Sequence, residues 1–266
     1  MRDVAATLQL MMLYKLSQKI RARYLKIHLY TLCWNEVRML PYFFRHYDHL
    51  IDRYFIDDNG STDGSIEMLS AHPKVTLGHF EVEGDSFVDA ARIHYNQCWK
   101  QSRGQADWVI VCNIDEHIYH RNLRGYLADC KRQGTSLIIP AGYNMISDTF
   151  PRTDEPLSRT IKYGVRDLFW DKPQLFNPNK IKEINFAPGR HTAAPTGEFL
   201  TPEAQDVKML HFKYLGIEYL IRRHSELRNG LTRRDIEEDW GNQYLWDEER
   251  NTEEYQRLKS QAQLVL

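Results

Sequence analysis

The sequence predicts an α/β fold with a mostly parallel sheet, helices on both faces of that sheet, and a helical extension at the C-terminus. Short apolar segments alternate with segments of helical periodicity from residue 27 to about residue 140. Acidic and turn-forming residues follow two of the apolar segments directly. In α/β proteins the carboxyl ends of parallel strands open onto the ligand crevice, so these residues also mark where a site is expected.

Turn residues divide the first half of the chain into elements. Strands are expected over five apolar segments: 27–33, 54–56, 75–82, 109–114 and 136–140. Helices are expected over four segments: 35–50, 65–70, 87–102 and 123–133. Pro41 strains the first of these helices. Such alternation of strands and helices is typical of a parallel sheet covered on both faces.

The pattern changes in the second half of the chain. Eight of the ten prolines lie beyond residue 139, and six of them interrupt the stretch 147–201. Long loops inside a domain are usually functional, so we expect part of a binding site in this stretch. Helical periodicity returns over 216–229 and 233–263. We therefore expect an N-terminal helix (1–26), a main domain (27–215) and a helical extension (216–266).

The N-terminal segment has an amphipathic pattern. Apolar residues recur at every fourth position: Val4, Leu8, Met12, Leu16 and Ile20. Basic residues accompany them: Lys15, Lys19, Arg21, Arg23 and Lys26. Two interpretations stay open, a helix that packs on its own domain or on another subunit, and a helix that lies peripherally on the anionic inner face of a membrane. The position of the basic residues argues against a cleavable signal peptide.

Composition restricts the class of protein. With 266 residues, of which 42% are hydrophobic and 27% charged, the chain can bury one substantial core. A formal net charge of -1 gives no electrostatic reason to expect a nucleic-acid partner. The four cysteines show no C-x-x-C spacing, which predicts reduced core residues and a cytoplasmic protein.

The first chemical motif is FIDDNGSTDGS, residues 55–65. The residues from Asn59 to Gly64 have the composition of a turn that follows a strand. Asp58 would lie at the carboxyl end of that strand and accept hydrogen bonds from a base or ribose, while Asp57 would face the other way. The alternative is that the motif is only a tight turn.

The second motif is DWVIVCNIDEHIYH, residues 107–120, in which Asp115 and Glu116 follow an apolar strand. Carboxylates at a strand end can hold a hard divalent cation, and such a cation can neutralise a diphosphate leaving group. The alternative is a solvated strand end. Because the two motifs lie about fifty residues apart, each behind an apolar strand, they predict a nucleotide-sugar site together.

Beyond these two motifs, LYTLCWNEVRMLPYFFRHY (29–47) and DAARIHYNQ (89–97) complete a pattern that resembles the GT-A glycosyltransferases, family 2 and relatives close to family 92. The resemblance runs from about residue 27 to residue 215 and implies the Rossmann-like GT-A fold. It also implies transfer of a sugar, with inversion, from a UDP-sugar to a saccharide or lipid-linked saccharide, in the assembly of a surface polysaccharide or glycan. Mn²⁺ or Mg²⁺ would assist. Asn113 departs from the family pattern, which has an acid there.

The resemblance implies roles for individual residues. Six of them would bind the donor: Trp34, Asn35, Glu36, Asp58, Arg92 and Asn113. Asp115 would bind the metal together with His211, which lies in the strand-like segment MLHFKYL; His191 is the competing ligand. For the catalytic base the candidates are Glu198 and Asp148, and we expect the acceptor near the proline-rich stretch that contains them.

Each of these assignments has a structural alternative. Arg92 is also explained by a surface salt bridge, Asn35 by a helix cap, and His211 by a satisfied core histidine. Two other functions also stay open. A sugar nucleotidyltransferase would need a glycine-rich phosphate loop, which the segment TLCWNEVR lacks. A non-catalytic nucleotide-sugar-binding subunit is supported by Asn113.

Overall fold

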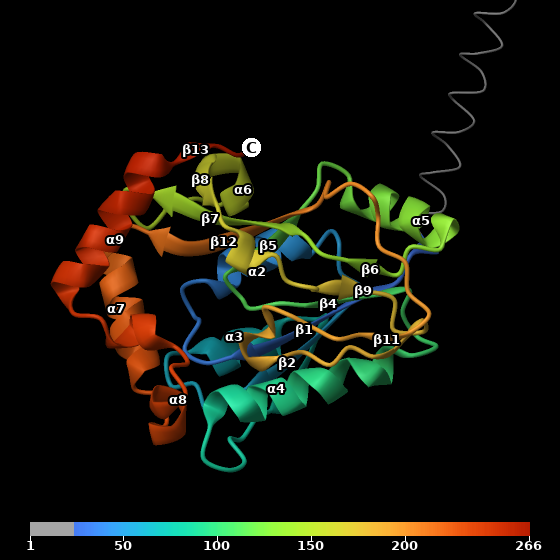
Figure 1. Ribbon diagram of the computed structural model, residues 1–266, viewed down its shortest axis with the longest axis horizontal. Helices are drawn as coiled ribbons and strands as arrows, with labels where there is room; N and C mark the ends of the chain where they lie inside the picture. The colour runs from blue at the N-terminus through green and yellow to red at the C-terminus, as the bar shows by residue number, and fades with distance from the viewer. Residues whose placement is uncertain (1–23) are drawn as a thin grey trace, which may run out of the picture.

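The computed structural model describes residues 24–266. Its main sheet has six strands in the order β3-β2-β1-β4-β9-β6 (Figure 1). Four strands are parallel: β1 (Ile27–Cys33), β2 (Arg53–Asp58), β3 (Val75–His79) and β4 (Trp108–Val111). The short strand β9 (Leu175–Phe176) is antiparallel to both β4 and β6 (Leu137–Ile138). The predicted α/β class with a mostly parallel sheet is confirmed.

Helices cover both faces of this sheet (Figure 1). On one face the core contains Leu29 and Ile110 together with residues of three helices: α2 (Leu40–Tyr47), α3 (Ser65–Ala71) and α5 (Leu123–Gln133). On the other face Tyr30 and Val111 pack with α4 (Phe87–Gln97) and the 3₁₀ turn η1 (Cys98–Ser102). All four residues of β4 are buried, as expected for a parallel strand covered on both sides.

Several predicted boundaries were wrong. The helix expected over 35–50 begins only at Leu40, because Asn35 has a φ of +53° and Pro41 occupies the first helical turn. Strand β2 extends to Asp58, while β3 ends at His79. The helix over 87–102 is divided into α4 and η1. Strand β4 ends at Val111 rather than at residue 114, so Asp115 lies in a turn and Glu116 begins the next strand.

A second sheet, which the sequence did not predict, packs beside the first. Its order is β13-β8-β7-β12-β5. The strands are β5 (Glu116–Tyr119), β7 (Ala141–Ser147), β8 (Tyr163–Arg166), β12 (Lys208–Leu215) and β13 (Gln263–Leu264). β12 is parallel to β7 and antiparallel to β5, with His211 opposite Glu116. This pairing brings a late segment of the chain to the turn after β4.

The stretch 147–201 consists mostly of loops with short elements. These are α6 (Leu157–Thr160), η2 (Leu168–Trp170), β10 (Ile181–Glu183), η3 (Pro188–Arg190) and β11 (Thr196–Gly197). Beyond β12 the chain forms helices at one end of the molecule (Figure 1): α7 (Ile217–Arg228), α8 (Arg233–Glu237), η4 (Asn242–Leu245) and α9 (Glu248–Gln261). The helical stretch expected over 233–263 is not continuous, since Gly241, with a φ of +75°, lies between α8 and α9.

The C-terminal helices are attached to the main sheet through Asp235. The Ser86 hydroxyl donates to its carboxylate at 2.5 Å, and the amides of Phe87 and Val88 donate at 3.1 and 3.2 Å. A carboxylate at a helix N-terminus satisfies amides that have no partner within the helix. Asp235 thus caps α4 from outside, and this contact ties α8 to the start of that helix.

The predicted N-terminal amphipathic helix, with its two interpretations, lies almost wholly outside the described residues. Within residues 24–266, no helix combines the length and the apolar character that crossing a membrane would require.

A buried histidine pair makes stability depend on pH. The ring of His46 stacks on that of His117 at 4.6 Å, and its Nε2 lies 2.8 Å from the carbonyl of Ile118. Burial lowers the pKa of His46 from 6.5 to about 4. The unfolded chain therefore takes up a proton near pH 6.5 that the folded chain takes up only near pH 4. The contribution of His46 to the free energy of unfolding is therefore full above pH 6.5 and is lost as the pH falls toward 4.

We therefore expect the free energy of unfolding of the wild type to fall, between pH 7 and pH 5, by about 2 kcal/mol more than that of His46→Gln. Urea unfolding at the two pH values measures the difference. His79→Gln, at an exposed position, is the matched control and should behave as the wild type does. Equal pH dependence in His46→Gln and the wild type would contradict the assignment.

Candidate active site

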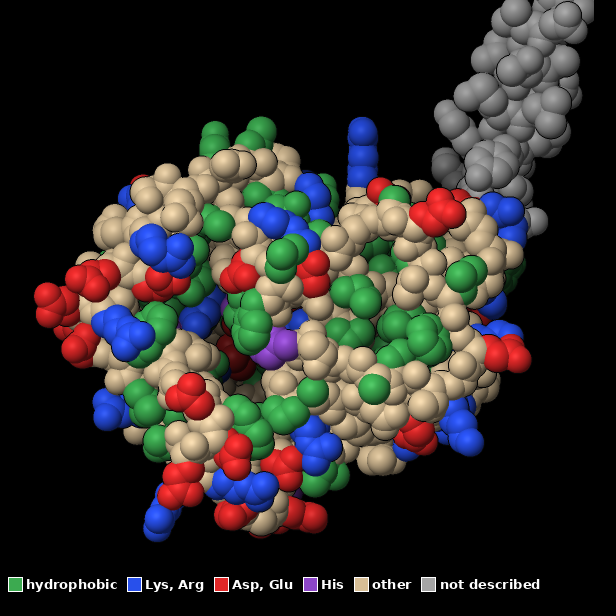
Figure 2. Space-filling model, viewed as in Figure 1, with side chains coloured by type: hydrophobic (Ala, Val, Ile, Leu, Met, Phe, Trp, Pro, Cys, Tyr) green, Lys and Arg blue, Asp and Glu red, His purple; other side chains and the backbone are tan. Residues whose placement is uncertain are grey.

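The strand order places a crevice at one edge of the main sheet. β1 lies between β2 and β4, so the order of the strands reverses between β1 and β4. Open α/β sheets bind ligands outside the carboxyl ends of the strands at such a point. The turn after β1 carries Trp34, Asn35 and Glu36, and the turn after β4 carries Asn113 and Asp115. Figure 2 shows a hollow on this face of the molecule, with a histidine and an acidic side chain in it.

The structure brings Asp115 and His211 together. Nε2 of the buried His211 lies 3.2 Å from a carboxylate oxygen of Asp115, and Nδ1 lies 3.0 Å from Oδ1 of Asn144. The Asn144 amide nitrogen donates to Asp167 at 3.0 Å, so its oxygen faces the histidine. Nδ1 of His211 therefore carries the proton. Nε2 then either carries a second proton, donated to Asp115, or presents a lone pair beside the carboxylate.

This pair fits a divalent cation. A carboxylate oxygen is an ordinary ligand of both Mg²⁺ and Mn²⁺, whereas an imidazole nitrogen suits a transition-metal ion such as Mn²⁺ better than Mg²⁺; neighbouring ligands of an octahedral ion lie about 3 Å apart. Metal-binding histidines usually donate their other N–H to an oxygen, as His211 does to Asn144. Among the described residues no group of three or more His, Cys, Asp and Glu side chains is arranged to hold a metal. The described chain would therefore supply two ligands.

Glu116 has a structural role although it follows Asp115 directly. Its side chain is fully buried; one oxygen accepts from Lys172 at 2.7 Å, and the other accepts from the backbone amide of Asn113 at 2.9 Å and from the Gln174 amide. Burial by itself would raise the pKa of Glu116, but the charges of Lys172 and Arg190 outweigh burial and hold the pKa at about 2. The ionised carboxylate closes the turn that presents Asp115.

Arg190 holds the side chain of Asn113. Its Nη2 donates to the Asn113 amide oxygen at 2.7 Å and lies 3.7 Å from Glu116. The buried guanidinium also lies 3.9 Å from the centre of the Tyr95 ring, and the backbone of Arg190 has a φ of +59°. A cation–π contact and a charge-assisted bond fix this arginine at the end of β4. The amide of Asn113 is oriented by it.

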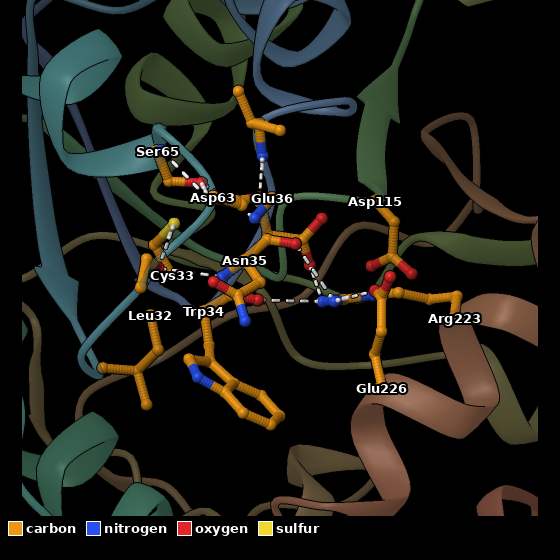
Figure 3. Close-up of polar contacts among 12 residues, drawn as sticks. Leu32, Cys33, Trp34, Asn35, Glu36, Asp63, Ser65, Asp115, Arg223 and Glu226 are labelled. Carbon is orange, nitrogen blue, oxygen red and sulfur yellow. Dashed lines mark hydrogen bonds and ion pairs between the residues drawn. The ribbon is translucent and has the colours of Figure 1, made fainter.

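The loops after β1 and β2 are joined by hydrogen bonds (Figure 3). The backbone amide of Asn35 donates to the Ser61 hydroxyl at 2.8 Å, and the backbone amide of Thr62 donates to the side-chain oxygen of Asn35 at 2.8 Å. Asp58 is buried, and its two oxygens accept from the Ser61 hydroxyl and amide at 2.6 and 2.8 Å. Asp58 thus holds the turn that holds Asn35, which is the structural alternative for this motif.

Strand alternation places the neighbouring carboxylate on the opposite side, as expected. Asp57 lies 3.0 Å from Nε2 of His94 on α4. This contact places Asp57 on the face of the main sheet that α4 covers, opposite to Ser61.

Arg223 of α7 fastens the turn after β1. It donates to the backbone carbonyls of Trp34 and Asn35 at 3.1 Å each, and it forms an ion pair with Glu36. Asp115 lies near the Arg223 side chain (Figure 3). Burial raises the pKa of Glu36 to about 7, which Arg223 partly offsets and Asp115 reinforces. The Glu36 amide donates to Ser65 at 2.9 Å. Both the backbone and the side chain of this turn are therefore fixed.

The remaining candidates pair with residues other than Asp115 and His211. Arg92 pairs with Asp89 at 2.7 Å on α4. Glu198 lies beside the β10–β11 hairpin with its side chain 93% exposed and Lys180 3.9 Å away. Asp148 follows β7, and its exposed carboxylate pairs with Lys259 at 2.6 Å.

The competing ligand, His191, does not contact Asp115. Its ring stacks on Phe169 at 3.8 Å and lies against Trp170, which also contacts the His211 ring at 4.0 Å. Trp170 thus separates the two histidines, and His211 is the one that reaches Asp115.

The sequence analysis missed several charged residues of this site. Lys172, Arg190 and Arg223 come from loops or helices far along the chain from the two motifs. Lys213 lies two residues after His211 in β12, and burial lowers its pKa to about 8, against the opposing effect of Asp115. Its spacing from His211 is the one signal in the sequence that points to any of them.

Comparisons with known proteins identify no family. No family model matches the chain, and no curated protein matches it. Among solved structures, S. aureus TarS is 12% identical, with a TM-score of 0.43 over 75% of this chain and 38% of that one. Glucosyl-3-phosphoglycerate synthase from Mycobacterium tuberculosis, in complex with Mn²⁺, UDP and phosphoglyceric acid, is 14% identical, with a TM-score of 0.32 over 48% and 46%. The chain spans less than half the length of either.

The two adjacent acids of this site should respond differently to loss of charge. Glu116→Gln leaves Lys172 buried without its partner charge, so it should lower the free energy of unfolding by about 3 kcal/mol. Asp115→Asn, whose side chain is 28% exposed, should change it by less than about 1 kcal/mol. Urea unfolding at pH 7 compares the two variants. Equal losses would contradict the division into a structural and a functional carboxylate.

Proposed function

We propose that the protein is a metal-assisted glycosyltransferase that moves a sugar from a nucleoside diphosphate donor, a UDP-sugar, to a saccharide or lipid-linked saccharide, with inversion. The observation that carries this proposal is the Asp115–His211 pair beside the crevice between β1 and β4. The resemblance of the motifs to GT-A family 2 and its relatives supports it. Assembly of a surface polysaccharide or glycan would be the corresponding biosynthetic role.

The metal would be held by Asp115 and His211. Bound Mn²⁺ or Mg²⁺ would neutralise the charge that develops on the departing diphosphate. Asn144 keeps the Nδ1 proton of His211 in place, so that Nε2 stays directed at Asp115. Glu116 holds the turn, so the Asp115 carboxylate needs no rearrangement before it binds.

The donor would lie across the turns after β1 and β4. Asn113, oriented by Arg190, would contact the ribose. Trp34, Asn35, Glu36 and Asp58 would contact the nucleoside, in a turn whose conformation Asp58 and Arg223 also fix. Arg92 is proposed to exchange Asp89 for the diphosphate, since its planar fork suits phosphate oxygens.

The catalytic base is proposed among the acids of the loop region. Inverting transfer needs a carboxylate within hydrogen-bond reach of the acceptor hydroxyl. Glu198 and Asp148 are both exposed and paired with a lysine in the structure. Asp148 is the better candidate because it also lines a groove beside the turn after β1, whereas Glu198 does not.

The metal assignment predicts that Asp115→Asn lowers UDP-sugar hydrolysis, without added acceptor, by about a hundredfold or more, because transition-state stabilisation of roughly 3 kcal/mol is lost. His211→Ala should weaken Mn²⁺ binding measured by calorimetry, whereas His191→Ala should not. Asn113→Asp should leave Mn²⁺ binding unchanged or strengthen it.

Full hydrolysis in excess EDTA, or by Asp115→Asn, would contradict metal assistance. Release of pyrophosphate from a nucleoside triphosphate would indicate a sugar nucleotidyltransferase instead. Binding of the nucleotide sugar with no turnover in the presence of Mn²⁺ and acceptor would indicate a non-catalytic subunit.

The two arginines should be separable by ligand. Arg92→Gln should weaken UDP binding about tenfold and leave uridine binding unchanged, because it would remove a charge-assisted bond to the diphosphate. Arg190→Gln should weaken the binding of both ligands, because Asn113 loses its orientation at the ribose. Calorimetric titration with each ligand measures this. Unchanged UDP affinity in Arg92→Gln would leave that residue as a surface ion pair only.

A further inference from the structure

We propose that the groove between α2, residues 148–154 and α7 binds the acceptor through an anionic group, such as the phosphate of a phosphorylated saccharide. This inference rests on the proposed transferase function and names the chemical class of its acceptor. The groove has a volume of about 1040 Å³, which is ample for a sugar phosphate. Its lining comes from three segments: 37–45, 148–154 and 216–222.

Three aromatic rings form a row along this groove. Phe150 lies between Tyr42 and Tyr219, with ring centres 5.8 Å and 4.6 Å away. Each ring comes from a different segment of the lining. Aromatic faces pack well against the C–H faces of sugar rings, so the row suits a saccharide better than a small inorganic ion.

An arginine guanidinium lies near each of these three aromatic rings. The guanidinium carbon of Arg45 lies 5.2 Å from the centre of the Tyr42 ring, that of Arg38 lies 5.9 Å from Phe150, and that of Arg222 lies 5.6 Å from Tyr219. Stacking leaves the N–H edges of a guanidinium available for an anion. The groove therefore combines flat apolar surfaces with cationic donors.

The acids of the groove leave part of this positive charge uncompensated. Asp154 pairs with Arg45 at 3.2 Å, and Asp148 pairs with Lys259, which lies outside the lining. The third acid is Glu218, exposed in the first turn of α7. Arg38 and Arg152 have no ion-pair partner among residues 24–266.

Arg222 lines the groove as well. It approaches Glu226 at 3.7 Å, and its Nη2 is buried without a hydrogen-bond partner within the described part of the chain. A phosphate in the groove would accept from the exposed guanidinium groups of Arg38 and Arg152, and charge-assisted bonds of this kind are among the strong ones in proteins.

The groove also lies next to the proposed donor site. Val37, at one end, follows Glu36 directly, and Tyr219 precedes Arg223 by one turn of α7. Arg223 and Glu36 are themselves paired at the turn after β1. An acceptor in the groove would thus approach the crevice between β1 and β4 from the side of α2 and α7, with Asp148 on the groove wall.

The test uses glucose 6-phosphate as the probe, titrated by calorimetry into the protein saturated with UDP and Mn²⁺, so that the donor site is filled. We expect binding that is at least tenfold tighter than that of methyl glucoside and tighter than that of inorganic phosphate. Raising the salt from 50 to 250 mM should weaken it severalfold, since exposed charges are screened. Stronger or equal binding of methyl glucoside or of inorganic phosphate would overturn the proposal.

Variants locate the site. The double variant Arg38→Gln/Arg152→Gln should weaken glucose 6-phosphate binding at least tenfold, and Phe150→Ala should remove its advantage over inorganic phosphate. Arg121→Gln, an exposed arginine outside the groove, is the control and should bind as the wild type does. Unchanged affinity in the double variant would overturn the proposal.

A separate measurement distinguishes failure of the groove from failure of the transferase. UDP binding with Mn²⁺ should be the same in the double variant and in the wild type. If the wild type binds no UDP, the transferase function fails, while the effect of the double variant on the sugar phosphate, titrated alone, still decides whether the groove is an anion site.

Discussion

The geometry of the site depends on the ion pair and hydrogen bonds of the buried Glu116 carboxylate. It accepts from Lys172, from the amide of Asn113 and from Gln174, and so it closes the turn after β4 around a single ionised group. A buried charge is costly unless paired and hydrogen-bonded, so this arrangement allows few alternative conformations. Since Asp115 precedes Glu116 directly, its position follows from that of its neighbour. The buried Glu116 thus places Asp115, the acid proposed to bind the metal.

The second sheet extends this constraint to residues far along the chain. Glu116 begins β5, and the register of β5 with β12 sets His211 opposite it. β12 in turn pairs with β7, where Asn144 stands opposite His211 and accepts a hydrogen bond from its Nδ1. The imidazole is therefore aimed by two strands, not by its own rotamer alone. The C-terminal helices contribute similarly, because α7 supplies Arg223 to the turn after β1.

The sequence predicted what local patterns determine and missed what distant segments supply. The bounds of β1 and α5 matched because an apolar run and turn residues define them, and the placement of His211 on a strand followed from its apolar neighbours. The helix start at residue 35 failed because the positive φ of Asn35 depends on contacts with Ser61 and Thr62. Lys172 lies in a loop and Arg190 in the three-residue element η3, neither of which has a periodic pattern, so only the folded chain shows that they meet Glu116.

The pattern around Arg92 shows why a motif match underdetermines a role. Asn96, one turn later, binds the backbone of Phe186 through both its amide oxygen and its amide nitrogen, which fixes the loop that leads to Arg190. The helix motif therefore also serves the site through that loop.

The same arrangement of charges explains why residue 113 is an asparagine and not an acid. Two cations, Lys172 and Arg190, face the carboxylate of Glu116, while the neighbouring Asp115 pairs with His211. A third carboxylate at position 113 would add repulsion within a buried region, whereas the neutral amide still accepts the 2.7 Å bond from Arg190. An asparagine at position 113 is thus compatible with a cation at Asp115. Asp115 itself would supply the carboxylate for such a cation, and Glu116 closes the turn that presents it.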